Sequence, residues 1–205
     1  MKHLALIGLL GASLSAASVA ATVNTAATVN TASNVNRVSR PNAARCGGSL
    51  WQMKTLSDPQ RKNVSLTPRT TTIGALATLQ APSRVPTGRS TSFQRQTWEL
   101  PASTVNYRRE TGGVRLILYD DTVYMNAVIP SPSCLPKTAR NRQAMIDTWK
   151  LFLRCAHPTT AWQSLGAVGF VRGIGFWSGQ RYGRGQAANG AELHPVTGFR
   201  PVVGC

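Results

Sequence analysis

Alternation of apolar and polar residues predicts strands through most of the second half of the chain. The expected strands are Phe93–Trp98 continuing past Pro101 into Thr104–Arg109, Val114–Tyr119, Val123–Ile129, Val168–Trp177 and Ala191–Val196. The second and third form a hairpin whose turn is Asp120-Asp121-Thr122. In this hairpin Val114, Leu116 and Leu118 share one face, and Arg115, Ile117 and Tyr119 share the other.

Helical periodicity is clearest within Ala139–Arg154. Its apolar stripe consists of Met145, Ile146, Trp149, Phe152 and Leu153, which predicts a helix that packs on the core. A shorter helix is expected over Thr70–Leu79, with a threonine cap and Ile73, Leu76 and Leu79 on one face.

The resulting order is strand, strand, strand, helix, strand, strand. This order predicts a mainly β protein with one principal helix (α+β), and specifically a five-stranded antiparallel barrel of the oligonucleotide- and oligosaccharide-binding (OB) type. Glycines at positions 169, 173 and 175 leave one face of a strand bare, which suits a strand that bends sharply around a barrel.

The N-terminal part divides into three segments before the barrel at 92–205. Residues 1–20 resemble a signal peptide, because Lys2 precedes an apolar run and small residues follow it; a retained anchor over Leu4–Ala20 is the alternative. Residues 21–45 repeat ATVNTA and lack aromatic residues, which predicts a disordered low-complexity tether. Residues 46–91 are expected to be an arm packed on the barrel. No later segment is long and apolar enough to span a membrane.

Export predicts a secreted, periplasmic or cell-envelope protein and an oxidising environment for the four cysteines. Two disulfides are therefore expected, and the cysteines alone permit three pairings. Zinc is the alternative, but none of the cysteines forms a CxxC pair. We expect no metal site and no cofactor.

The chain has 23 basic and seven acidic residues, for a formal net charge of +16. Eighteen of the basic residues are arginine, whose planar fork matches phosphate and carboxylate groups. Solubility through net charge is the alternative explanation, and a polyanion partner is the favoured interpretation.

The OB frame brings two Arg- and Gly-rich segments to the positions of its binding loops, Arg108–Gly113 between strands one and two and Ser178–Asn189 between strands four and five. A single-strand binder needs cations for phosphates and aromatic faces for bases. The candidate polyanion-binding residues are Arg108, Arg109, Arg115, Tyr119, Tyr124, Trp177, Arg181, Tyr182 and Arg184. Trp177 fits a core position equally well.

The sequence thus favours an exported basic module that binds polyanions, above all single-stranded nucleic acid. A divalent-metal-dependent nuclease on the same barrel is the first alternative, with Asp120, Glu192 and His194 as its candidate catalytic residues. Asp120 also suits a tight turn, and His194 also suits a structural position bonded inside the end of the barrel. Strand alternation puts Glu192 and His194 on one face, where a hydrogen bond between them is sterically possible. A non-catalytic cell-envelope interaction protein is the second alternative.

Three stretches, CGGSLWQMKTLSD (46–58), RLILYDD with MNAVIPSPSC (115–121, 125–134) and GIGFW…ANGAELHPV (173–196), resemble small exported bacterial proteins of unassigned function. The resemblance implies the disulfides Cys46–Cys134 and, by remainder, Cys155–Cys205. That family tends to carry Asp and His where Ser178 and Arg181 stand here, so this chain departs from the pattern within the loop on which its functional interpretation depends.

Overall fold

The computed structural model describes residues 46, 48–121, 123–179 and 182–205. In this part of the chain the protein is mainly β, with six strands in one sheet and few helices. The strands are β1 (Ser65–Thr70), β2 (Gln96–Glu110), β3 (Gly113–Tyr119), β4 (Tyr124–Pro130), β5 (Gln163–Trp177) and β6 (Ala191–Val203). The expected count of five strands was wrong by one.

The additional strand is β1, which pairs in parallel with the start of β2 and shifts register between Ser65 and Pro68. Its sequence, SLTPRT, has only one apolar side chain besides the proline, so no hydrophobic alternation marks it. Pro68 also lowers the expectation of a strand, because proline cannot donate to a ladder.

The other strands are those expected, but several are longer. β2 continues through Pro101 without a break, and the antiparallel pairings of Leu100, Pro101 and Ala102 with β5 are continuous. β6 extends past the predicted end at Val196 to Val203, since its pairing with β5 resumes beyond Gly198.

Strand order in the sheet is β1-β2-β3-β4-β6-β5, and β5 also pairs with β2. Five strands are therefore linked in a circuit of pairings, β2-β3-β4-β6-β5-β2. All of these pairings are antiparallel except β4 with β6, where Asn126 stands opposite Glu192 and Ala127 opposite Leu193.

The glycines of β5 lie where neighbouring backbone comes close. A Cβ at Gly173 would stand 2.9 Å from both the Leu193 Cβ and the Pro195 carbonyl oxygen, distances that real Cβ atoms essentially never show. A Cβ at Gly175 would collide with the carbonyl oxygen of Phe93. The bare face of β5 is thus used for close strand packing.

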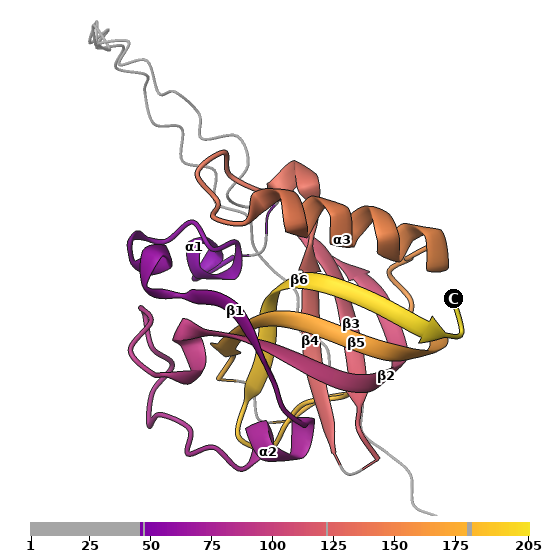
Figure 1. Ribbon diagram of the computed structural model, residues 1–205, viewed down its shortest axis with the longest axis horizontal. Helices are drawn as coiled ribbons and strands as arrows, with labels where there is room; N and C mark the ends of the chain where they lie inside the picture. The colour runs from indigo at the N-terminus through magenta and orange to yellow at the C-terminus, as the bar shows by residue number, and fades with distance from the viewer. Residues whose placement is uncertain (1–45, 47, 122, 180–181) are drawn as a thin grey trace, which may run out of the picture. The chain divides into compact units, whose positions relative to one another are not determined.

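The α-helices are α1 (Trp51–Lys54), α2 (Ile73–Ala77) and α3 (Arg142–Cys155), and the 3-10 turns are η2 (Pro59–Asn63), η3 (Phe93–Arg95) and η4 (Pro132–Cys134). Figure 1 shows α3 across one end of the strands and α2 near the opposite end. In α2 the Thr72 hydroxyl accepts from the Ala75 N–H at 3.0 Å, and Ile73 and Leu76 are buried. Leu79 is outside this helix and 37% exposed, so the predicted helix was too long.

The core lies on one face of the strands, as the alternation predicts. Val114, Leu116 and Leu118 of β3 and Met125, Ala127 and Ile129 of β4 belong to one buried cluster with Phe152 of α3. Side chains at the intervening positions point to the opposite face of the sheet. We call this second surface, made by Arg115, Ile117, Tyr119, Tyr124, Asn126, Glu192 and His194, the outer face.

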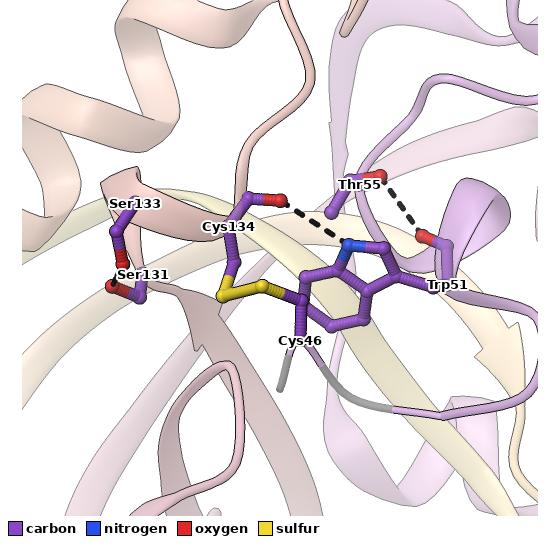
Figure 2. The surroundings of a disulfide bond; sticks show 6 residues. All are labelled: Cys46, Trp51, Thr55, Ser131, Ser133 and Cys134. Atoms are coloured by element: carbon purple, nitrogen blue, oxygen red, sulfur yellow. Dashed lines mark hydrogen bonds between the residues drawn. A yellow bond between two sulfur atoms is a disulfide. The ribbon is translucent and has the colours of Figure 1, made fainter. Parts of the chain in front are cut away.

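Two disulfides fasten the ends of the described chain. Cys46 is bonded to Cys134 with a Cα–Cα distance of 5.3 Å, and Cys155 at the end of α3 is bonded to Cys205 at 4.8 Å. These are the pairs that the resemblance implies. Beside the first, the Trp51 indole N–H donates to the Cys134 carbonyl at 3.2 Å (Figure 2), which attaches α1 to η4.

Among the described residues there is no helix of the length and apolarity that crossing a membrane requires.

Candidate polyanion-binding site

A pocket of about 410 Å³ lies on the outer face, between the β2–β3 hairpin and the connection from β5 to β6. We call it the Arg108 pocket. Its lining side chains include those of Arg108, Arg115, Asn126, Trp162, Tyr182, Arg184 and Gln186. Arg108, Arg115, Tyr182 and Arg184 were all candidates from the sequence, so candidates up to 76 positions apart line one pocket.

Trp162 organises the cationic wall of this pocket. The guanidinium carbon of Arg108 lies 4.6 Å from the indole centroid, and that of Arg184 lies 5.5 Å from it. Both distances are within cation–π range. The indole therefore holds one arginine from the end of β2 and one from the connection between β5 and β6. Arg108 was expected in a loop but lies in β2, because the strand continues to Glu110.

Sequence reasoning missed Trp162. It stands just before β5 in the polar stretch TTAWQS, where no periodicity gives its direction. The available signal was a tryptophan among polar residues, outside any apolar pattern.

Glu110 joins two of the cations. Its carboxylate accepts from Arg108 at 2.7 Å through Oε1 and from Arg115 at 2.8 Å through Oε2. Arg108 is 38% exposed, whereas Arg115 is 18% exposed and also bonds Glu192 at 3.4 Å. Arg108 thus keeps surface that can meet a ligand, and Arg115 is largely committed to neighbouring carboxylates.

The carboxylate of Glu192 is buried on the outer face beneath α1. Burial raises the pKa of this carboxyl, but the bond to His194 and the charges of His194, Arg115 and Lys54 outweigh it, and the pKa is lowered. Burial lowers the pKa of His194, against the opposing effect of Glu192. His194 Nδ1 lies 3.3 Å from Glu192 Oε1, so the two side chains form a buried hydrogen-bonded pair.

α1 covers this pair and brings one more cation to the surface. The Trp51 ring packs edge-on against the His194 ring at 6.3 Å, and the Lys54 ammonium lies 5.5 Å from the centroid of Phe176. Burial lowers the pKa of Lys54, and Glu192 acts in the opposite direction. A neighbouring pocket of about 410 Å³, lined by Lys54, Arg115, Ser178 and Glu192 among others, borders the Arg108 pocket at Arg115.

The loop after β5 is fastened over the outer face by amide side chains. Asn126 donates to Gln186 at 3.3 Å, and Gln186 donates to the Ser178 hydroxyl at 2.9 Å. Gly185 stands so close to Ile117 that a Cβ there would lie 2.6 Å from the isoleucine side chain. These contacts fix one wall of the Arg108 pocket.

The remaining candidates lie elsewhere. Tyr119 and Tyr124 are opposite each other near the β3–β4 turn and stack at 4.6 Å, so each ring uses one face on the other. Arg109 is exposed beside the Arg108 pocket and lines a separate depression with Thr111. Arg181 lies outside the described residues.

Trp177 is a core residue, and its interpretation as a stacking platform was wrong. It is 3% exposed, its ring packs on Phe93 at 4.7 Å, and its N–H donates to the Thr91 hydroxyl at 3.1 Å. Strand alternation explains the difference, since Trp177 pairs with Ala191 on the core face of β6.

The three candidate catalytic residues do not form one site through their described contacts. Asp120 accepts from the Gly74 N–H at 2.9 Å and the Val123 N–H at 3.2 Å, joining α2 to the hairpin turn. Glu192 and His194 are bonded to each other on the outer face, as strand alternation predicts. Within the described residues, no group of three or more His, Cys, Asp or Glu side chains gathers as a metal site would require.

Comparison of the chain with protein-family models and with curated proteins finds no match.

Proposed function

We propose that this protein is an exported OB-like barrel module that binds polyanions in the Arg108 pocket, with single-stranded nucleic acid as its ligand. The observation that carries the proposal is that Arg108, at the end of β2, and Arg184, between β5 and β6, both lie on Trp162. A phosphate chain crossing the pocket would meet both guanidinium groups, and bases could stack on the exposed ring of Tyr182.

The circuit of strand pairings supports the OB-like barrel. β2, β3 and β4 precede α3, β5 and β6 follow it, and β5 returns to β2. In an OB fold the ligand lies on the second and third strands, between loops 1–2 and 4–5. The strands that correspond to them are β3 and β4, and the Arg108 pocket is lined from these strands, from the end of β2 and from the connection between β5 and β6, which supports the comparison.

Export is supported by the signal-like N-terminus and by two disulfides, which persist in oxidising compartments. The resemblance of residues 46–58, 115–121, 125–134 and 173–196 to small exported bacterial proteins also supports export.

Binding is better supported than metal-dependent cleavage. Asp120 serves the hairpin turn and the start of α2, and the buried carboxylate of Glu192 is engaged by Arg115 and His194. Neither carboxylate presents a free edge to the Arg108 pocket, whereas Tyr182 and Arg184 are exposed there.

A salt titration of single-stranded DNA binding tests the proposal. We expect log K to fall linearly with log salt, by about 0.7 for each phosphate contacted. The double variant Arg108→Ala/Arg184→Ala should bind more weakly and lose about 1.4 from this slope, because two contacts are removed.

The matched control is Arg69→Ala/Arg200→Ala, which removes two exposed arginines from β1 and the far half of β6. Arg200 also lies over an aromatic ring, at 4.1 Å from Phe170. Absence of salt-dependent binding, or equal losses in the two double variants, would refute the Arg108 pocket as the binding site.

A further inference from the structure

Asn126 carries a buried hydrogen-bond acceptor at the Arg108 pocket. The residue is 2% exposed, lines the pocket, and its Oδ1 has no partner among the described residues. Buried polar atoms of folded proteins are nearly always hydrogen-bonded. A buried acceptor without a partner at a pocket therefore indicates that a ligand donates a hydrogen bond to it.

The hydrogen bonds around Asn126 indicate which atom of its amide lacks a partner. The Gly190 carbonyl only accepts, so the Ser178 hydroxyl donates to it at 3.1 Å. That hydroxyl then accepts from the Gln186 NH₂, which leaves the Gln186 oxygen to accept from the Asn126 NH₂. Exchanging N and O in the amide of Asn126 or of Gln186 would bring two donors or two acceptors together. The Asn126 atom without a partner is therefore the oxygen.

The surroundings of this oxygen are cationic and aromatic. Arg108, Arg115 and Arg184 supply donors, and Tyr182, 94% exposed, supplies a ring at the same pocket. A phosphate or sulfate group satisfies the donors but brings no N–H for Asn126. An unstacked nucleobase brings a planar face for an aromatic or guanidinium surface and an N–H on its pairing edge.

We propose that the Arg108 pocket holds an unstacked nucleobase whose N–H donates to Asn126 Oδ1. This inference rests on the proposed function, because it names the part of a single-stranded ligand that the pocket recognises. The pocket volume of about 410 Å³ is in the range of small-molecule sites. The protein thereby distinguishes nucleic acid from other polyanions of equal charge.

Changing the ligand tests this with the unaltered protein. Wild-type protein is titrated with oligodeoxyadenylate, with the same oligomer carrying N6,N6-dimethyladenine, and with inorganic polyphosphate of matched charge. Dimethylation removes both N–H donors and leaves the phosphates unchanged. We expect about tenfold weaker binding of the dimethylated oligomer, the effect of one lost hydrogen bond, with the same salt slope.

Asn126→Leu tests the same contact from the protein side. This variant should bind unmodified oligodeoxyadenylate about tenfold more weakly than wild type does. It should bind the methylated and unmodified oligomers with equal affinity, and polyphosphate with the wild-type affinity. Asn106→Leu is the matched control, since it removes an amide of β2 that is not among the residues lining the Arg108 pocket. It should remain sensitive to methylation.

The outcomes separate the two proposals. If the wild-type protein binds both oligomers equally with a salt-dependent affinity, the base-reading role of Asn126 is overturned and polyanion binding stands. If neither oligomer nor polyphosphate binds, the proposed function fails and the inference with it. If Asn126→Leu does not fold, the comparison of ligands on wild-type protein still decides.

Discussion

Burial of the His194 side chain on the outer face makes the stability of the protein depend on pH. His194 is 4% exposed, and burial lowers its pKa below the ordinary 6.5. Stability rises with pH wherever the unfolded chain binds more protons than the folded one. As the pH falls below about 6.5, an unfolded His194 takes up a proton that the folded one does not, so the folded state loses stability.

We expect the free energy of unfolding to decrease between pH 7.5 and 5.5, with a contribution from His194 of at most about 1.4 kcal/mol at the lower pH. Urea unfolding at both pH values measures it. His194→Gln should make the free energy of unfolding less dependent on pH, because a glutamine can still bond Glu192 but has no ionisable side chain. His157→Gln, at an exposed position, should keep the wild-type dependence, and a similar flattening in this control would contradict the assignment.

Individual side chains also show where sequence reasoning succeeds. Arg115 was placed correctly on the face of β3 opposite Val114 and Leu116, because period-two alternation with apolar neighbours is a direct geometric signal. The bond between the amides of Asn126 and Gln186 was not predicted, since it joins residues 60 positions apart. Nothing local in the sequence specifies which distant polar groups meet.

At the scale of elements, the segment before β2 is held together by a buried arginine. Arg89 is 2% exposed; its guanidinium bonds Asp58 at 2.9 Å and donates to the carbonyl oxygens of Met53 and Gln94. Asp58 also caps η2 by accepting from Gln60. One side chain thus connects α1, η2 and η3, none of which is longer than five residues.

Arg89→Met should therefore destabilise the protein by about 3–5 kcal/mol, because it leaves the Asp58 carboxylate buried without its partner. The control is Arg172→Met, which breaks the Glu99–Arg172 pair on β2 and β5, where the arginine is 42% exposed. That pair is screened by solvent and should contribute no more than about 1 kcal/mol. Denaturant midpoints of the two variants compare the losses, and equal values would argue against a structural role for Arg89.

The same elements show why the front of the chain was harder to predict than the rest. β3 and β4 are short apolar runs joined by a turn, and α3 has an apolar stripe over several turns, so these three elements were anticipated nearly to their ends. β1 and α1 have four to six residues each. Elements this short gain their stability from tertiary contacts such as those of Arg89, which a sequence pattern does not contain.

At the scale of the whole molecule, the question is whether binding follows the net charge of +16 or the geometry of one pocket. Arg37, Arg40 and Arg45 belong to the predicted tether and lie outside the described residues. If the tether also contacts phosphates, changing all three to Gln should reduce the salt slope for a long single strand by up to about 2, at 0.7 per contact. The same change should leave unaltered the binding of an oligonucleotide just long enough to fill the Arg108 pocket.

Titrations of long and short strands against both the tether variant and Arg108→Ala/Arg184→Ala measure this difference. Charge spread evenly over the molecule would make the two variants lose affinity in proportion to the charges removed, whatever the ligand length. A built pocket makes the short strand sensitive to Arg108 and Arg184 and insensitive to the tether arginines, because an indole holds the two guanidinium groups at 4.6 and 5.5 Å. Loss of short-strand binding in the tether variant would show instead that net charge, and not the Arg108 pocket, governs the affinity.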